Sequence, residues 1–275
     1  MCNKHNMKEM IQNTVHVKMH AIRTIGQTVL NLLEGIGKVV IFMLNSIYAM
    51  VTPKFHKRKI MKQFIEVGYY SLPVVGLTAI FTGMVLALQS YSGFSRFNAE
   101  SSIATVVVLS ITRELGPVLA GLMVAGRVGA SMAAEIGTMR VTEQIDALTT
   151  LSTNPYRYLI APRLWAGLLT LPLLVMVADI IGVMGGYVVA IHKLGFNPAS
   201  YLKATYDYLE FKDVWSGLVK ASAFGFIVTL MGCYHGYNSN RGAQGVGRAT
   251  TAAVVSASIM ILLSNYIITE LLFSK

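Results

Sequence analysis

Long apolar stretches alternate with short polar ones along most of this chain. Four stretches reach the roughly 20 mainly apolar residues that a helix needs to cross a bilayer. They are Val67–Ser95, Leu164–His192, Ala221–Asn240 and Ala249–Thr269. Ser101–Gly126 is a fifth stretch if Arg113 and Glu114 are accepted inside it. The pattern predicts an all-α polytopic membrane protein with five transmembrane helices.

The segment before Pro53 has a different pattern. Between residues 22 and 47 apolar positions recur at helical spacing, and charged side chains fill the other faces. The uncharged run after Lys38 stops at Pro53, which favours an interfacial amphipathic helix over a sixth transmembrane helix. We therefore expect a cytoplasmic tail and interfacial helix in residues 1–62 and a five-helix membrane domain in residues 63–275.

Composition and charge agree with a membrane protein. Hydrophobic residues make up 54% of the chain and charged residues only 13%, whereas soluble domains carry about 25% charge. With a cytoplasmic N-terminus, sixteen Lys and Arg fall inside and six outside, so the C-terminus should lie on the outer side. No aromatic-basic module accompanies the net charge of +10, so nucleic-acid binding is not expected. The six outer residues are Arg96, Lys193, Lys203, Lys212, Lys220 and Lys275.

Small side chains recur at every fourth position in the region after Glu114. Such spacing places them on one helix face, where they allow close approach of a neighbouring helix. The face could slide or rock against its neighbour, or it could serve static packing, and the sequence leaves both interpretations open. The residues are Gly121, Ala125, Gly129, Ala133 and Gly137.

Arg113 and Glu114 are the least expected residues in their stretch. Charge at mid-membrane costs at least ~2.5–3.5 kcal/mol per residue on insertion scales and indicates a functional site by default. Adjacent helix positions point about 100° apart, so each of the two needs another partner, water or a polar ligand group. Packing against neighbouring helices is the alternative. If the pair serves a cavity, replacement of either residue by Leu is expected to leave folding intact and even to add stability.

Motifs for catalysis are missing from the sequence. Gly37-Lys38 is followed by Val39 and is not a phosphate-binding loop, and the glycine-rich run 242–247 lacks the preceding strand of a dinucleotide site. Neither a His-Glu-x-x-His nor a Gly-x-Ser-x-Gly motif occurs. Cys2 and Cys233 are too few for a disulfide framework. We therefore expect no enzyme activity, no cofactor and no metal site.

An amphipathic pattern follows the small-residue stripe. Val141, Ile145 and Leu148 form an apolar stripe, and Glu143 and Asp146 share another face. A helix over Thr138–Leu151 with this pattern either rests on its own bundle or docks into a separate protein.

One known family shares these features. The run Arg113–Leu148, RELGPVLAGLMVAGRVGASMAAEIGTMRVTEQIDAL, closely resembles the signature of the Mla-type (MlaE/YrbE) permeases of ABC lipid transporters. Leu164–Leu174, Gly182–Gly186 and Gly247–Thr251 resemble that family too, and the resemblance covers roughly residues 20–275.

The resemblance implies a homodimeric permease of the bacterial inner membrane that moves phospholipid between the inner and outer membranes. It implies three protein partners: a cytoplasmic ABC ATPase, a STAS-domain protein and an outer MCE-domain lipid-binding protein. ATP hydrolysis is then expected in a partner chain. Residues 63–275 would form the permease domain, with a cytoplasmic coupling segment at about 132–163.

The same resemblance assigns site residues. The lipid cavity is expected at Arg113, Glu114 and Leu115. Contact with the ATPase is expected at Glu143, Gln144, Asp146 and Leu148.

The alternative function, from another class, is an ion-coupled secondary transporter that uses intramembrane Glu114 and Asp179 as proton sites. The lone Asp179 is otherwise open to a structural interpretation.

Overall fold

The structure, a computed structural model, is helical almost throughout the part of the chain that it describes. Among those residues no strand occurs, which confirms the all-α class. The chain divides into two compact units, Met1–Asn45 and Ser46–Lys275. Residues 1–25 of the predicted tail and interfacial helix, and the outer positions Arg96 and Lys275, lie outside the described residues. The described residues are 26–27, 29–31, 33–52, 57–95 and 102–273.

The first described helix, Val29–Val51, is long and apolar enough to cross a membrane. Many of its side chains are exposed and apolar, among them Leu33 and Ile41. Glu34 and Lys38 form the i,i+4 pair that their spacing permits, at 2.7 Å. The length of this helix is therefore compatible both with a transmembrane helix and with an interfacial one, and the interfacial position stays a prediction.

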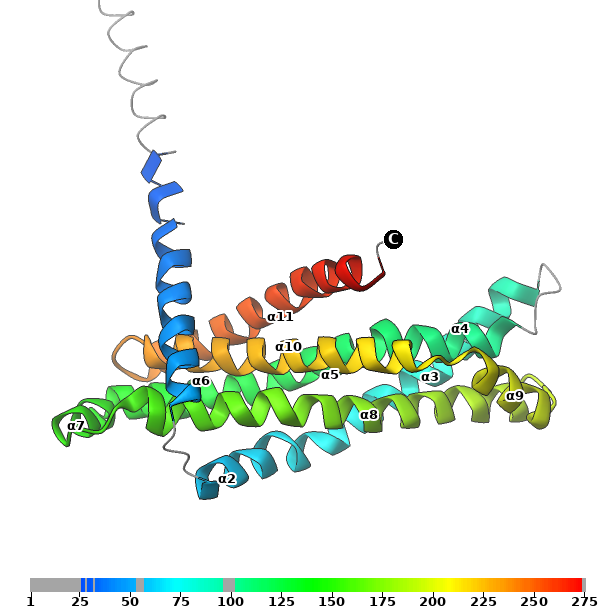
Figure 1. Cartoon of the computed structure of the whole chain (residues 1–275), viewed down its shortest axis with the longest axis horizontal. Coiled ribbons are helices and arrows are strands. Elements are labelled where there is room, and N and C mark those ends of the chain that lie inside the picture. Colours follow the sequence, from blue (N-terminus) through cyan, green and yellow to red (C-terminus); the bar gives the residue numbers. More distant parts are fainter. Residues whose placement is uncertain (1–25, 28, 32, 53–56, 96–101, 274–275) are drawn as a thin grey trace, which may run out of the picture. The chain divides into compact units, whose positions relative to one another are not determined.

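Five further helical stretches, all in the unit Ser46–Lys275, are long and apolar enough to be transmembrane helices. They correspond to the five predicted spans. Because consecutive stretches run in opposite directions, α7 (Gln144–Thr150) and α9 (Pro198–Tyr208) lie at opposite ends of the bundle (Figure 1), which we call the α7 end and the α9 end. The stretches are Arg58–Phe94, Ile103–Val141, Tyr156–His192, Phe211–Tyr237 and Ala243–Phe273.

The first three stretches each combine several helical elements. The first contains α2 (Lys57–Val67), η1 (Tyr69–Ser71) and α3 (Leu72–Phe94). The second runs through α4 (Ile103–Ser110), η4 (Ile111–Leu115), α5 (Gly116–Val124), η5 (Ala125–Gly129) and α6 (Ala130–Val141). The third consists of η6 (Tyr156–Ile160) and α8 (Ala161–His192).

The turns η4, η5 and η6 are π-helical, and each contains an arginine. Turns of this kind widen the helix locally and are frequent at functional sites. Arg113 lies in η4, Arg127 in η5 and Arg157 in η6. The helix of the second stretch continues beyond the predicted span Ser101–Gly126 and ends at Val141.

The helix α10 (Phe211–Tyr237) lies at the centre of the bundle, against α5, α6, α8 and α11 (Ala243–Phe273). Glycine makes these contacts close. A Cβ atom on Gly225 would lie 2.1 Å from the carbonyl oxygen of Gly167, and one on Gly217 would lie 2.4 Å from that of Thr112. The backbones therefore touch, as small-residue helix interfaces in membranes do.

The predicted small-residue stripe lies on the face of its helix that meets α10 and α11. Ala125 and Ala133 are fully buried. A Cβ on Gly121 would meet Phe224 of α10 and Ile261 of α11, each at 3.4 Å. In the structure the small-residue stripe packs against α10 and α11. A role in which this helix face slides against its neighbours stays a prediction.

Lys220 is a correction to the sequence analysis, which placed it in the outer segment. The helix α10 already begins at Phe211, so Lys220 lies more than two turns inside it, and its side chain is fully buried. A lysine ends an apolar stretch in a hydropathy pattern, so the pattern places the residue outside the transmembrane helix. The pattern contains no information about a distant residue whose opposite charge offsets that of the lysine.

At the α9 end, α9 is held by local capping and by one buried tyrosine. The Asn197 side chain accepts hydrogen bonds from the backbone N–H groups of Ala199 and Ser200. Tyr201 packs against Ala104 and Ala190, and burial raises the pKa of its phenol to about 12. The phenol is therefore neutral and serves packing. Other aromatic residues nearby are exposed, as a membrane-interface belt requires: Tyr206, Tyr208 and Trp215.

Candidate functional site

Arg113 in η4 binds the carboxylate of Asp213, which is 100 residues away in the sequence. The Nε and a terminal nitrogen of Arg113 lie 2.7 and 2.6 Å from Asp213 Oδ1. Asp213 is in the first turn of α10, where its other oxygen accepts the backbone N–H of Glu210 at 3.1 Å in a capping box. The Arg113 guanidinium also lies over the Phe273 ring, 5.0 Å from its centroid. One carboxylate thus both caps α10 and holds Arg113.

Glu114, the next residue, binds a different part of α10. Its Oε1 accepts a hydrogen bond from Lys220 Nζ at 2.6 Å. The same ammonium group donates to the backbone carbonyl of Arg113 at 3.0 Å. From α11, Asn265 donates to Glu114 Oε2 at 3.0 Å, and the Thr269 hydroxyl lies 3.3 Å from Oε1. As their spacing predicts, Arg113 and Glu114 do not pair with each other.

The two ion pairs share one asymmetry. Asp213 and Lys220 are buried, with side chains 1% and 0% exposed, whereas those of Arg113 and Glu114 are 36% and 38% exposed. The buried partners hold the exposed charges in place at the level of the transmembrane helices. We call these four residues with Asn265 and Thr269 the mid-membrane cluster, after the position of Arg113 and Glu114 halfway along the predicted span Ser101–Gly126. It presents both a cation and an anion in an otherwise apolar region.

Four members of this cluster, Asp213, Lys220, Asn265 and Thr269, were missed by the sequence analysis. Two weak signals were available. Asp213 and Lys220 are seven residues apart and therefore lie on one face of α10, with charges opposite to those of Arg113 and Glu114. Asn265 and Thr269 are an i,i+4 polar pair in an apolar helix.

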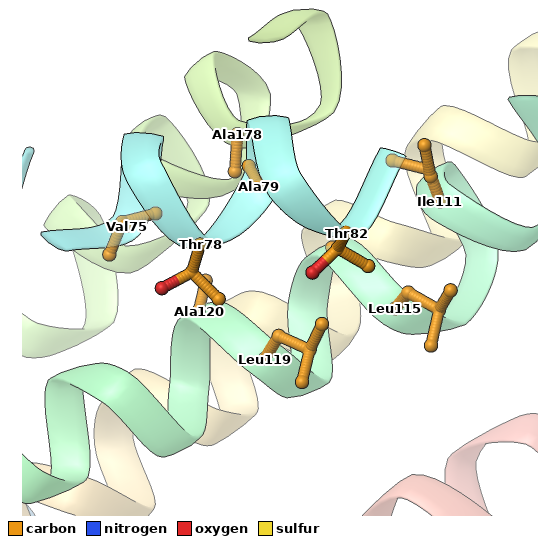
Figure 2. Close-up of a pocket in the computed structure, with 10 residues that line it drawn as sticks. Val75, Thr78, Ala79, Thr82, Ile111, Leu115, Leu119, Ala120 and Ala178 are labelled. Atoms are coloured by element: carbon orange, nitrogen blue, oxygen red, sulfur yellow. The ribbon is translucent and has the colours of Figure 1, made fainter. Parts of the chain in front are cut away.

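Leu115, the third residue predicted at the lipid cavity, faces a different place. It lines a pocket with Thr78 and Thr82 of α3 and Ala178 of α8, and Figure 2 shows these side chains around the opening. The pocket has a volume of only about 10 Å³, which is about the space that one water requires. The structure therefore brings Arg113 and Glu114 together with α10 and α11, but does not bring Leu115 to them.

Asp179 of α8 is buried close to this pocket. Its side chain packs against the backbone of Gly116, where a Cβ atom would lie 1.9 Å from Asp179 Oδ1. Within the described residues Oδ1 has no hydrogen-bond partner. Among the described residues Asp179 therefore forms no hydrogen bond with the mid-membrane cluster, and it packs against the helix of Glu114 at Gly116.

The predicted amphipathic helix over Thr138–Leu151 is two helices and not one. The helix α6 ends at Val141, and α7 begins after Glu143, which has a left-handed backbone with φ of 58°. Val141 and Ile145 are thus on different helices, which corrects the single amphipathic helix over Thr138–Leu151. Few residues other than glycine adopt a left-handed backbone without strain. At Glu143 this conformation separates α6 from α7.

The residues predicted to contact an ATPase lie at the α7 end of the bundle (Figure 1). Ile145 is buried and anchors α7, whereas Glu143, Gln144 and Asp146 are exposed and Leu148 is half-buried. Asp146 pairs with Arg140 at 2.7 Å. The exposed side chains form a polar surface that another protein could reach.

Comparison with known proteins agrees with these features. The family model described as "Permease MlaE" matches residues 60–271. A "Probable ABC transporter permease protein" of Rickettsia bellii is 61% identical over 255 residues, which cover 93% of this chain and 98% of the relative. The "Intermembrane phospholipid transport system permease protein MlaE" of Haemophilus influenzae is 34% identical over 253 residues, which cover 92% and 97%. The chain therefore belongs to the MlaE permease family.

Proposed function

We propose that this chain is the membrane permease subunit of an ABC-type transporter that moves phospholipid between the inner and outer membranes. The family and the printed function of the Haemophilus influenzae relative support this proposal. The sequence has transmembrane helices but no phosphate-binding loop, so a separate ATPase chain supplies the energy.

The observation that carries the proposal is the half-exposed pair of charges at Arg113 and Glu114. A phospholipid needs apolar surface for its tails and polar groups at one level for its head. Asp213 and Lys220 hold the two charges at one level, while the neighbouring helix α11 exposes apolar side chains such as Ile259, Leu263 and Ile267. Charged residues inside membrane proteins commonly mark such a substrate path.

Partners and orientation follow as parts of the same proposal. The exposed apolar face of α11 meets a second copy of the chain in a homodimer. The cytoplasmic ATPase contacts Glu143, Gln144, Asp146 and Leu148 at the α7 end, and a STAS-domain protein joins the ATPase. An MCE-domain protein binds at the α9 end, on the outer side of the inner membrane. The N-terminus is then cytoplasmic and the C-terminus periplasmic.

The test is lipid transfer by the complex purified gently from native membranes and reconstituted in vesicles. Glu114→Gln should reduce ATP-dependent phospholipid transfer per folded complex severalfold, whereas Glu270→Gln, on the exposed surface of α11, should not. Transfer that needs a proton gradient and no ATP would instead support the ion-coupled alternative based on Glu114 and Asp179. Robust ATP hydrolysis by the pure chain alone would contradict the permease assignment.

A further inference from the structure

A second polar site lies at the α7 end of the bundle, away from the mid-membrane cluster. The start of α2, the end of α6 and the turn η6 meet there around a pocket of about 240 Å³, several times the roughly 30 Å³ that one water occupies. Three basic residues line the pocket, and one carboxylate accompanies them. The lining residues used below are Lys59, Lys62, Glu135, Tyr158 and Arg163, with Met139 and Pro162 as apolar neighbours.

The basic residues differ in how firmly they are held. Arg163 is buried, donates to the Leu159 carbonyl at 2.7 Å and pairs with Glu135 at 2.8 Å. Its Nε is buried without a hydrogen-bond partner among the described residues. Lys59 lies over the Tyr158 ring, with Nζ 2.8 Å from the ring centroid. The pocket therefore has a fixed arginine in its wall and a lysine positioned by an aromatic ring.

The charge balance of the pocket favours an anion. Glu135 offsets one of the three cations, so the lining keeps a net positive charge. Lys62 is exposed, and within the described residues no ion pair is formed by it. A lysine without a carboxylate is a donor that phosphate oxygens satisfy well, and the Arg163 guanidinium adds positive charge to the wall of the same pocket.

The surroundings of the pocket favour a lipid head group over a soluble molecule as the source of that anion. The pocket lies where three transmembrane stretches end or begin, so it is at the level of the membrane surface. Met139 and Pro162 supply apolar walls beside the charges, and the neighbouring α2 residues Met61 and Ile65 are exposed and apolar. Basic pockets between transmembrane helices at this level bind the head groups of anionic phospholipids.

We infer that the pocket between α2, α6 and η6 is a binding site for the phosphate head group of an anionic phospholipid in the leaflet at the α7 end. The phosphate contacts Lys59 and Lys62, Arg163 adds positive charge from the wall, and the acyl chains lie along the apolar surface of α2. This site is separate from the mid-membrane cluster and goes beyond the proposed transport function. It requires only the single chain.

The test uses the full-length purified chain in neutral detergent, titrated with phosphatidylglycerol or phosphatidylcholine, with bound lipid counted by native mass spectrometry. The wild type should retain at least one phosphatidylglycerol in preference to phosphatidylcholine. In Lys59→Gln/Lys62→Gln, binding of one phosphatidylglycerol should weaken about 30-fold, because each surface lysine contributes to attraction of an anionic lipid. Both lysines are at least partly exposed, so the variant should fold.

Two variants control for general charge and for folding. Lys193→Gln/Lys203→Gln removes the same charge from exposed positions at the α9 end and should leave this binding unchanged. Lys59→Arg/Lys62→Arg keeps the charge and should retain the lipid. Glu135→Gln removes the carboxylate that offsets Arg163, so phosphatidylglycerol should bind severalfold more tightly.

Three results would overturn the proposal. Equal loss of phosphatidylglycerol in the two Lys→Gln pairs would show only general attraction to charge. Displacement of the lipid by millimolar inorganic phosphate would assign the pocket to a soluble phosphate. Unchanged lipid binding in Lys59→Gln/Lys62→Gln, together with loss of a co-purifying protein, would assign the pocket to a protein partner.

Discussion

The ammonium nitrogen of Lys220 lies 2.6 Å from Glu114 Oε1, and the lysine side chain is fully buried in α10. Its other acceptor is the backbone carbonyl of Arg113. Lys220 therefore depends on Glu114 for the only carboxylate that it contacts among the described residues. This dependence reverses the expectation that removal of the Glu114 charge would add stability, because the loss of Glu114 leaves a lysine buried without a counter-charge.

Glu114→Leu should lower the stability of the folded chain by about 3–5 kcal/mol, the cost of removing one partner of a buried ion pair. Joint replacement, Glu114→Leu with Lys220→Met, should restore most of that stability, because no buried charge is left unmatched. The melting temperatures of the purified wild type, single and double variants form a double-mutant cycle.

The cycle also separates packing from lipid handling. If Glu114 serves the lipid, the stable double variant should still carry less phospholipid and transfer it more slowly. Full lipid content and normal transfer in that variant would assign the pair to packing alone. Additive single-variant effects would show that Lys220 and Glu114 do not interact energetically.

The mid-membrane cluster shows where reading the sequence succeeds and where it stops. Spans such as Leu164–His192 were predictable because an apolar run is a local property. The need of Arg113 and Glu114 for distant partners followed from helix geometry. The partners Asp213 and Lys220 could not be identified, because a single sequence does not tell which residues 100 positions apart will touch.

The predicted helix boundaries were wrong where contacts with residues distant in the sequence outweigh local sequence preferences. The start of α10 was placed at Ala221 because Lys220 looked like an outer residue, yet Glu114 offsets its charge. The break between α6 and α7 was missed because Glu143 adopts the left-handed backbone that usually calls for glycine or asparagine. The predicted spans were otherwise located correctly, since hydropathy dominates their placement.

Gly116→Ala should destabilise the chain, because its methyl group would lie 1.9 Å from Asp179 Oδ1. Overpacking of this kind typically costs about 1–3 kcal/mol. Asp179→Ala removes the obstructing carboxylate, so the double variant Gly116→Ala/Asp179→Ala should be more stable than Gly116→Ala alone. Thermal unfolding of the purified chains measures both effects.

Gly126→Ala is the matched control, since nothing lies within 4 Å of a Cβ at that position, and it should change the melting temperature little. Failure of Asp179→Ala to rescue Gly116→Ala would mean that the Ile111 carbonyl, 2.9 Å from the same Cβ, causes the strain. If Asp179→Asn abolishes transport at normal stability, Asp179 has a role beyond packing.

The proposed topology predicts which exposed positions react from each side of the membrane. In a chain without Cys2 and Cys233, Lys203→Cys in α9 should be labelled by an impermeant maleimide from the outer side. Arg241→Cys, in the exposed turn before α11, should be labelled only after the membrane is opened. Labelling of both positions from one side would contradict the alternating arrangement of α8, α10 and α11.

Charge reversal at the α7 end should uncouple ATP hydrolysis from transport without unfolding the chain. The Asp146–Arg140 pair is 39% exposed on the arginine side and 61% on the aspartate side, so its loss should cost at most about 1 kcal/mol. Glu143→Lys/Asp146→Lys should therefore insert normally but bind or stimulate the ATPase poorly. A control variant for the backbone is Glu143→Gly, which removes one charge and fits the left-handed backbone without strain, so it should not reduce the melting temperature. Normal ATP-driven lipid transfer by the double Lys variant would remove both residues from the coupling surface.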